Sequence, residues 1–258
     1  MQQKPRLAVH KFSSCDGCQL AILNMGDKLI QLAKLVDIVH FVEAGVVNEN
    51  AMADIALVEG SISTAHDLQR IQRVRENSKM LVSIGACATS GGLQALRNIY
   101  DDGQWLGELY ASPQYIDSLK TSAAINESVK VDFELWGCPI SSDQIIALVA
   151  GVLHGARPRQ DKQNVCMECK RQQNNCVMVA MKIPCMGAVT HNGCGALCPS
   201  FGRDCYGCYG PAEHINTDAL SQRFAGLGLT NLQRRHRFHL IHSHSADFRQ
   251  AGERADHD

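Results

Sequence analysis

The twelve cysteines of this chain fall into three sets of four, and this grouping limits what the chain can fold into more than any other feature. The first set is spread over the first 140 residues, and the other two are compact. The sets are Cys15, Cys18, Cys87 and Cys138; Cys166, Cys169, Cys176 and Cys185; and Cys194, Cys198, Cys205 and Cys208. Four thiolates are what one cubane iron–sulfur cluster requires, so the count predicts three [4Fe–4S] clusters with no cysteine left over.

Composition places the chain among cytoplasmic proteins with bound metal. The formal net charge is −1, so nothing predicts binding to nucleic acid or to an anionic membrane. The first ten residues contain no apolar export signal, and the longest apolar run, 145–153, is about half of the ~20 residues that a membrane span requires. We therefore expect a cytoplasmic protein with no membrane span. In that compartment, abundant cysteine favours metal ligation over disulfides.

The first 155 residues alternate short apolar runs with helical patterns, which predicts a doubly wound α/β domain with a parallel sheet. Strands are predicted at 7–10, 37–42, 55–58, 80–84 and 129–136. Apolar residues at helical spacing predict a helix over 22–36. The Ser63-Thr64 pair is a candidate cap for a second helix, and Ser141 with Gln144 forms a candidate capping box for a third, ending at Gly155. The stretch 100–126 is less regular and reads as an insertion.

The cysteines of the first set all follow predicted strands. Cys15 and Cys18 follow 7–10, Cys87 follows 80–84, and Cys138 follows 129–136. Sites in open α/β folds gather beyond the carboxyl ends of the strands, so these three loops should converge. An ordinary buried thiol is the alternative for any one of them. The glycine-rich segment 85–92 lacks the Lys-Ser/Thr pair of a phosphate loop.

The character of the chain changes after residue 159. Residues 166–211 hold eight cysteines but little apolar periodicity, so this segment must be held by metal. The spacings are Cys-x2-Cys-x6-Cys-x8-Cys and Cys-x3-Cys-x6-Cys-x2-Cys, and two structural zinc sites remain an alternative. The predicted organisation is a cluster-binding α/β domain at 1–158, an irregular Cys-rich domain with two clusters at 159–212 and a tail at 213–258.

Three motifs resemble the proximal-cluster motifs of the small subunit of [NiFe] hydrogenases. They are Cys15-Asp-Gly-Cys18, Gly85-Ala-Cys87 with Gly91-Gly92 behind it, and Gly137-Cys138-Pro139. The resemblance covers roughly residues 5–212 and implies a flavodoxin-like fold for the first domain. It further implies a distal cluster on the second set of cysteines and a medial cluster on the third.

Departures from the exported members of that family point to a subgroup. Cys166 stands where exported members have a histidine, and Cys198 would give the medial cluster a fourth cysteine. With no visible export signal, the chain resembles the small (delta) subunit of cytoplasmic, NAD(P)-linked sulfhydrogenase-type enzymes. This resemblance implies electron transfer from the nickel–iron site of a partner large subunit, through three clusters, to flavin/iron–sulfur diaphorase subunits. It also implies that the chain carries no catalytic residue itself.

Other readings remain open. A hydrogenase coupled to heterodisulfide reductase or to a deazaflavin-linked enzyme would need a similar small subunit. The cluster subunit of respiratory NADH:quinone oxidoreductase shares the first domain, but it carries adjacent cysteines and lacks the later eight. A zinc-stabilised scaffold is the non-enzyme reading. Glu59 falls in a loop that this family places near the proximal cluster, although a solvated loop glutamate is commoner. The histidines of the tail, at 236, 239, 242 and 244, could bind metal, but we expect a solvated, partly helical or disordered end.

Overall fold

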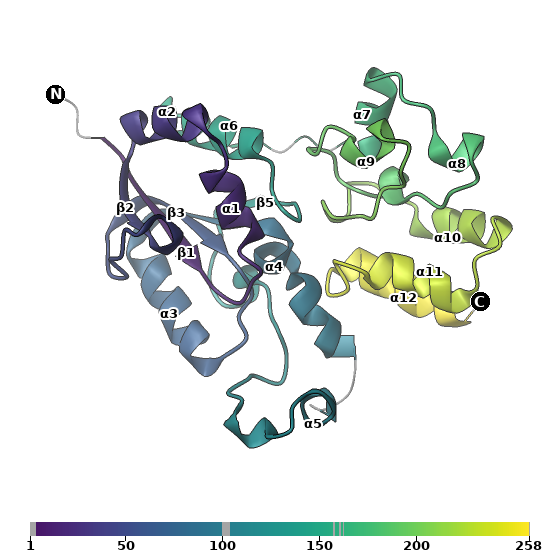
Figure 1. The fold of residues 1–258 in the computed structure, drawn as a ribbon, viewed down its shortest axis with the longest axis horizontal. Helices are drawn as coiled ribbons and strands as arrows, with labels where there is room; N and C mark the ends of the chain where they lie inside the picture. Colours follow the sequence, from purple (N-terminus) through teal and green to yellow (C-terminus); the bar gives the residue numbers. More distant parts are fainter. Residues whose placement is uncertain (1–3, 100–103, 157, 160, 162, 258) are drawn as a thin grey trace. The chain divides into compact units, whose positions relative to one another are not determined.

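A computed structural model describes residues 4–99, 104–156, 158–159, 161 and 163–257 of the chain. The chain divides into two compact units, Met1–Pro158 and Arg159–Asp258 (Figure 1).

The first unit is built on five parallel strands in the order β2-β1-β3-β4-β5. Its strands are β1 (Arg6–Lys11), β2 (Asp37–Phe41), β3 (Ala53–Glu59), β4 (Ser78–Ile84) and β5 (Phe133–Leu135). Its helices are α1 (Gly17–Leu23), α2 (Asp27–Leu35), α3 (Ala65–Glu76), α4 (Gly85–Ser90), α5 (Gln104–Leu109) and α6 (Ser142–Leu153). This is the strand order of flavodoxin-like folds, so the predicted fold class of this unit is confirmed.

Both faces of the sheet are buried, because successive side chains of a strand point to opposite sides. One face, with Val9, Leu57 and Ile84, packs under α1, α2 and α6. The other face, with Val58 and Leu81, packs under α3 and α4. A sheet covered on both sides leaves its carboxyl edge as the place where polar or ligand-bearing loops can gather.

Two predicted helix starts are confirmed. Thr64 accepts a hydrogen bond from the backbone N–H of Asp67, and its own N–H donates to the Asp67 carboxylate, which completes a capping box at the start of α3. Ser141 and Gln144 form the corresponding box at the start of α6. In both boxes side-chain oxygens accept backbone N–H groups that the first helical turn leaves unpaired.

Two predicted elements differ from the structure. The helix expected over 22–36 is split into α1 and α2, because the intervening Gly26 has a φ of 59°, outside the helical region. The strand expected over 129–136 shrinks to β5. The side chain of Asp132 accepts the backbone N–H of Leu81 at 2.8 Å, so the pairing of β4 with β5 covers only three residues of each strand. Part of the expected insertion, 100–103, lies outside the described residues; the rest contains α5 and short turns.

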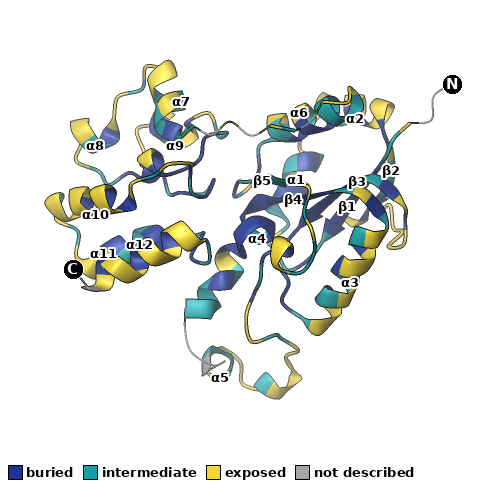
Figure 2. Cartoon of the chain, turned by 180° about the vertical axis from the view of Figure 1, so that it is seen from behind, coloured by how far each residue is buried: buried dark blue, intermediate teal, exposed yellow. Residues whose placement is uncertain are grey.

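The second unit is helical. Its helices are α7 (Val165–Arg171), α8 (Val177–Ala180), α9 (Leu197–Ser200), α10 (Thr217–Gly226), α11 (Asn231–His239) and α12 (Ala246–His257). The helices α11 and α12 bury one side and expose the other (Figure 2). Phe224, Phe238 and Phe248 form one hydrophobic cluster with Cys185 and Cys205 of the Cys-rich segment. The end of the chain is helical, in agreement with one part of the expectation. It is also folded onto this segment, so the expectation of a solvated or disordered end is wrong.

Candidate metal centres

All four cysteines of the first set line one cavity of about 60 Å³. Cys15 and Cys18 lie at the start of α1, Cys87 lies in α4 directly after β4, and Cys138 follows β5. The structure therefore brings together three loops that are far apart in sequence, at the edge where the strands end. Glycines at 17, 85 and 137 share the lining with Glu59, Ile84, Ala86 and Pro139.

Two glycines keep space free around the sulfur atoms of this cavity. A Cβ on Gly85, whose φ is 84°, would lie 2.4 Å from the Sγ of Cys18. A Cβ on Gly92, whose φ is 58°, would lie 2.8 Å from the Sγ of Cys87. Any side chain at either position would occupy the space beside a thiol, so the glycine-rich segment forms a cradle around the cysteines. Four cysteines in such a cradle fit the ligand set of a cubane iron–sulfur cluster.

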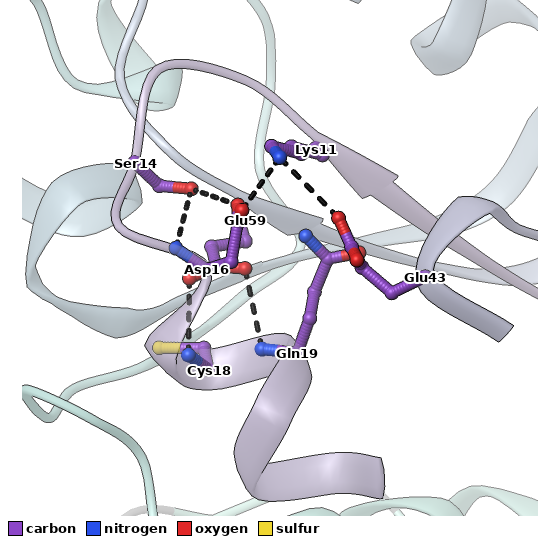
Figure 3. Close-up of polar contacts among 7 residues, drawn as sticks. All are labelled: Lys11, Ser14, Asp16, Cys18, Gln19, Glu43 and Glu59. Carbon is purple, nitrogen blue, oxygen red and sulfur yellow. Dashed lines mark hydrogen bonds and ion pairs between the residues drawn. The ribbon is translucent and has the colours of Figure 1, made fainter.

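Glu59 fixes the loop that carries Cys15 and Cys18. It ends β3, is only 2% exposed, and its carboxylate accepts the backbone N–H of Cys18 at 3.0 Å and that of Gln19 at 3.2 Å (Figure 3). Burial raises the pKa of Glu59 above its ordinary value. This glutamate is therefore buried, whereas a loop glutamate is more commonly solvated. Its position beside the cavity agrees with the place near the proximal cluster that the family resemblance implied. The available signal was a charged residue directly after the apolar run 55–58.

A second set of polar contacts holds the turn between the two cysteines. Asp16 has a φ of 64° and contacts Lys11 Nζ through its Oδ2 atom at 2.6 Å. Lys11 also contacts Glu43 at 3.3 Å, and the Ser14 hydroxyl donates to Asp16 Oδ1 at 3.1 Å (Figure 3). These bonds stabilise a backbone conformation that a residue other than glycine rarely adopts.

Three thiols of this cavity, those of Cys18, Cys87 and Cys138, resist ionisation in the absence of a cation. Burial raises the pKa of Cys87 to about 12, and the charges of Cys138, Cys15 and Glu59 act in the same direction. Burial also raises the pKa of Cys18 and of Cys138. Thiolates held this close repel each other, so they require a positively charged partner such as iron to be stable together.

The second set of cysteines also comes together. The Sγ atoms of Cys185 and Cys166 lie 3.5 and 3.6 Å from the position of a Cβ on Gly187. Burial raises the pKa of Cys166 to about 11, and the charges of Cys185, Cys169 and Cys176 raise it further. Cys166 and Cys169 belong to α7, Cys176 caps α8, and Cys185 precedes a short turn.

The third set is seen as two neighbouring pairs. Burial raises the pKa of Cys194, and the charges of Glu168 and Cys198 add to this effect. Burial also raises the pKa of Cys205, and the charge of Cys208 raises it further. The backbone N–H of Cys205 donates to the Sγ of Cys185 at 3.3 Å, which links this set to the second.

No three Cys, His, Asp or Glu side chains of the described residues are arranged to hold a single metal ion. A cubane differs from such a site because each of its four thiolates binds a different iron atom.

The segment beyond residue 212 packs against the loop of the last cysteine pair. This packing was not predicted from the sequence. His242 is buried, its Nε2 atom lies 3.0 Å from the carbonyl oxygen of Cys208, and burial lowers its pKa to about 4. Arg237 forms an ion pair with Asp204 and lies over the ring of Tyr206. His242 and Arg237 thus support the loop that carries Cys205 and Cys208. Only the three phenylalanines at 224, 238 and 248 could have signalled this packing.

Comparison with known proteins gives a consistent class. The family model described as "NADH ubiquinone oxidoreductase, 20 Kd subunit" matches residues 15–152. The delta subunit of sulfhydrogenase 2 from Pyrococcus furiosus is 33% identical over 83% of this chain and 90% of its own length. A subunit of the vhu F420-non-reducing hydrogenase from Methanococcus voltae is 28% identical, with 88% of this chain and 90% of its own length covered.

A solved structure supports the same class. A chain in the crystal structure of an NAD⁺-reducing [NiFe]-hydrogenase in the H2-reduced state is similar to this one, with a TM-score of 0.56 and 26% identity. The match covers 62% of this chain and 96% of that chain. The present chain belongs to the 20 kDa subunit family of NADH:ubiquinone oxidoreductase. Within it, the chain is a hydrogenase small subunit, and so part of an oxidoreductase. No helix among the described residues is both long and apolar enough to cross a membrane.

Proposed function

We propose that this chain relays electrons from the nickel–iron site of a partner large subunit, through three [4Fe–4S] clusters, to flavin/iron–sulfur diaphorase subunits that reduce NAD(P). The observation that carries the proposal is the cavity at the carboxyl edge of the sheet, lined by all four cysteines of the first set and kept open by glycines. Iron–sulfur clusters supply one-electron transfer when bound.

The ligand assignment gives each cluster one set of cysteines. Cys15, Cys18, Cys87 and Cys138 hold the proximal cluster in the unit 1–158. Cys166, Cys169, Cys176 and Cys185 hold the distal cluster, and Cys194, Cys198, Cys205 and Cys208 hold the medial cluster, both in the second unit. The mutual effects among the thiols of the second set support this grouping, as do the two close pairs of the third.

Ligation by cysteine alone suits a hydrogen-linked electron path. Replacing thiolate by neutral histidine raises the reduction potential of a cluster, so all-cysteine ligation keeps the potential low. Low potentials let electrons pass in both directions between hydrogen and a nicotinamide. The proposal places the complex in the cytoplasm, where thiols stay reduced and available to iron.

The electron acceptor has a second candidate. The similar crystal structure is named for NAD⁺ reduction, which supports the diaphorase partner. The Methanococcus relative is instead named as part of an F420-non-reducing hydrogenase, which favours a route to another acceptor such as heterodisulfide reductase. Hydrogen-dependent reduction of NAD⁺ or NADP⁺ by the intact complex supports the first route. Hydrogen-dependent reduction of an artificial viologen alone favours the second.

The cluster proposal is tested by metal content and spectroscopy. The tagged chain is purified anaerobically from its host, and iron, sulfide, nickel and zinc are quantified. About twelve irons per chain with co-purifying nickel are expected, from four per cubane. Zinc in place of iron would support the scaffold reading instead.

A pair of reciprocal variants assigns the clusters. In Cys198→Ala only the EPR signal of the medial cluster should change, and in Cys138→Ala only that of the proximal cluster. Unchanged EPR spectra in both variants would refute the ligand assignment.

A further inference from the structure

The helix α7 contributes to two cysteine sets at once. Cys166 and Cys169 on this helix belong to the second set. Between them in sequence lies Glu168, whose carboxylate accepts the backbone N–H of Gly193 at 2.9 Å through Oε1 and that of Ala196 at 3.1 Å through Oε2. Both of these N–H groups belong to the loop that carries Cys194 and Cys198 of the third set.

The loop held by Glu168 has an unusual backbone. Gly193, Gly195 and Ala196 have φ angles of 122°, 64° and 48°. Positive φ is unfavourable for alanine, so Ala196 keeps this conformation only because its surroundings impose it. The two hydrogen bonds that the carboxylate of Glu168 accepts account for this restraint.

A second residue of the same helical face completes the attachment. Gln172 follows Glu168 by four positions, so both side chains lie on the same side of α7 and its end. The Gln172 amide donates to the carbonyl oxygen of Gly195 at 2.8 Å, and its oxygen accepts the Ser200 hydroxyl at 2.9 Å. Glu168 therefore accepts two N–H groups of this loop, and Gln172 donates to one of its C=O groups.

The charge of Glu168 lies beside a candidate cluster ligand. Its Oε2 atom is 3.9 Å from the Sγ of Cys194, and the N–H of Ala196 faces this sulfur as well as the carboxylate. Two effects follow from this position. The negative charge disfavours an added electron on iron held by Cys194, and the carboxylate competes with sulfur for an N–H donor. Net charge and hydrogen bonds to the sulfurs both set cluster potentials, and here both lower the potential.

We propose that Glu168 is a positioning residue that orders the Cys194–Cys198 loop from the helix of the second set and lowers the reduction potential of the third-set cluster. The inference rests on the proposed function, because it requires a cluster on the third set. A loop anchored to α7 would also keep the two cysteine sets of this unit in a constant arrangement.

The test is a redox titration of the intact, anaerobically purified complex, followed by EPR. Glu168→Gln keeps the size of the side chain but removes its charge and one of its two acceptors. The matched control is Glu253→Gln, which removes the same charge from an exposed position on α12. The third-set signal is identified as the one that changes in Cys198→Ala. In Glu168→Gln this signal should titrate at a more positive potential, with iron per chain unchanged and the first-set signal unmoved.

A midpoint equal to that of the Glu253→Gln control would overturn the inference. If Glu168→Gln binds less iron, Glu168→Asp, which keeps the charge, decides the question: restored iron and potential support the inference, and iron loss in both variants overturns it. The absence of any third-set signal in the unmodified complex would instead overturn the proposed function and the inference together, so the two failures can be told apart.

Discussion

Replacing Gly85 by alanine tests directly whether the cavity lined by the first set of cysteines holds a cluster. The added methyl group would lie 2.4 Å from the Sγ of Cys18, whereas non-bonded carbon atoms pack best at roughly 3.5–4.0 Å. Cys18 is only 6% exposed and its backbone N–H is held by Glu59, so its sulfur has little room to move away. We therefore expect the Gly85→Ala chain to displace the thiol from the cavity.

The energetic cost of Gly85→Ala has two parts, and a control variant separates them. A positive φ costs an alanine about 1–2 kcal/mol. Forcing an extra methyl group into a packed site costs typically about 1–3 kcal/mol more. Gly45 has a φ of 78°, close to the 84° of Gly85, but a Cβ there meets no atom within 4 Å. Gly45→Ala therefore carries only the backbone cost, and the difference between the variants measures the collision with Cys18.

The assay is iron and acid-labile sulfide per chain, with thermal unfolding measured in parallel. Gly85→Ala should lose about four irons, the content of one cubane, while Gly45→Ala should keep the full content. In thermal unfolding, each kcal/mol corresponds to a shift of about 2–4 °C for a domain of 150–250 residues. Equal iron content in the two variants would refute the reasoning that the cavity of the first set houses a cluster.

Two further substitutions test the core of each unit. Burial lowers the pKa of His10 from 6.5 to about 3. The folded state therefore holds this histidine neutral, and the free energy of unfolding is not reduced by its protonation above pH 6.5. Below pH 6.5 the free energy of unfolding falls by about 1.4 kcal/mol per pH unit, until the pH reaches about 3. Acid titration of unfolding should be flatter in His10→Phe than in the wild type. A profile parallel to that of the wild type would contradict the assignment. Phe238→Ala should lower the free energy of unfolding by about 3–5 kcal/mol, since Phe238 is 1% exposed. The control Phe201→Ala, at a side chain that is 77% exposed, should change it by no more than about 0.5 kcal/mol. Equal denaturant midpoints for the two variants would show that the C-terminal helices do not support the second unit.

The sheet was predictable because its signals are local. Each inner strand is a short apolar run, and each of two helices begins with side chains that bond their own backbone, as at Thr64 and Ser141. Parallel strands end at a common edge, so the position of a cysteine after a strand was enough to place it. This is why the convergence of the first set could be inferred from order along the chain alone.

The features that were missed depend on a single backbone angle or on contacts between distant segments. The spacing of apolar residues over 22–36 is helical throughout, and only the backbone angle of Gly26 separates α1 from α2. The alternation of Val129 and Val131 suits a strand, yet both side chains pack against the cluster under α3. The helices beyond residue 212 are rich in charged side chains, so their burial against the Cys-rich segment follows from three phenylalanines that sequence reasoning gave no weight.

The two units solve the same problem in the same way. A loop that carries cysteines must bend sharply, and its unpaired N–H groups need acceptors. Glu59 supplies both oxygens of one carboxylate to the N–H groups of Cys18 and Gln19, and Glu168 does the same for Gly193 and Ala196. A lysine offers no acceptor and a glutamine offers one oxygen, whereas a carboxylate offers two. The carboxylate that orders each loop also lies beside a cysteine, Glu59 beside Cys18 and Glu168 beside Cys194. If the proposed clusters are bound, one side chain in each unit would both position the ligands and place a negative charge near the iron.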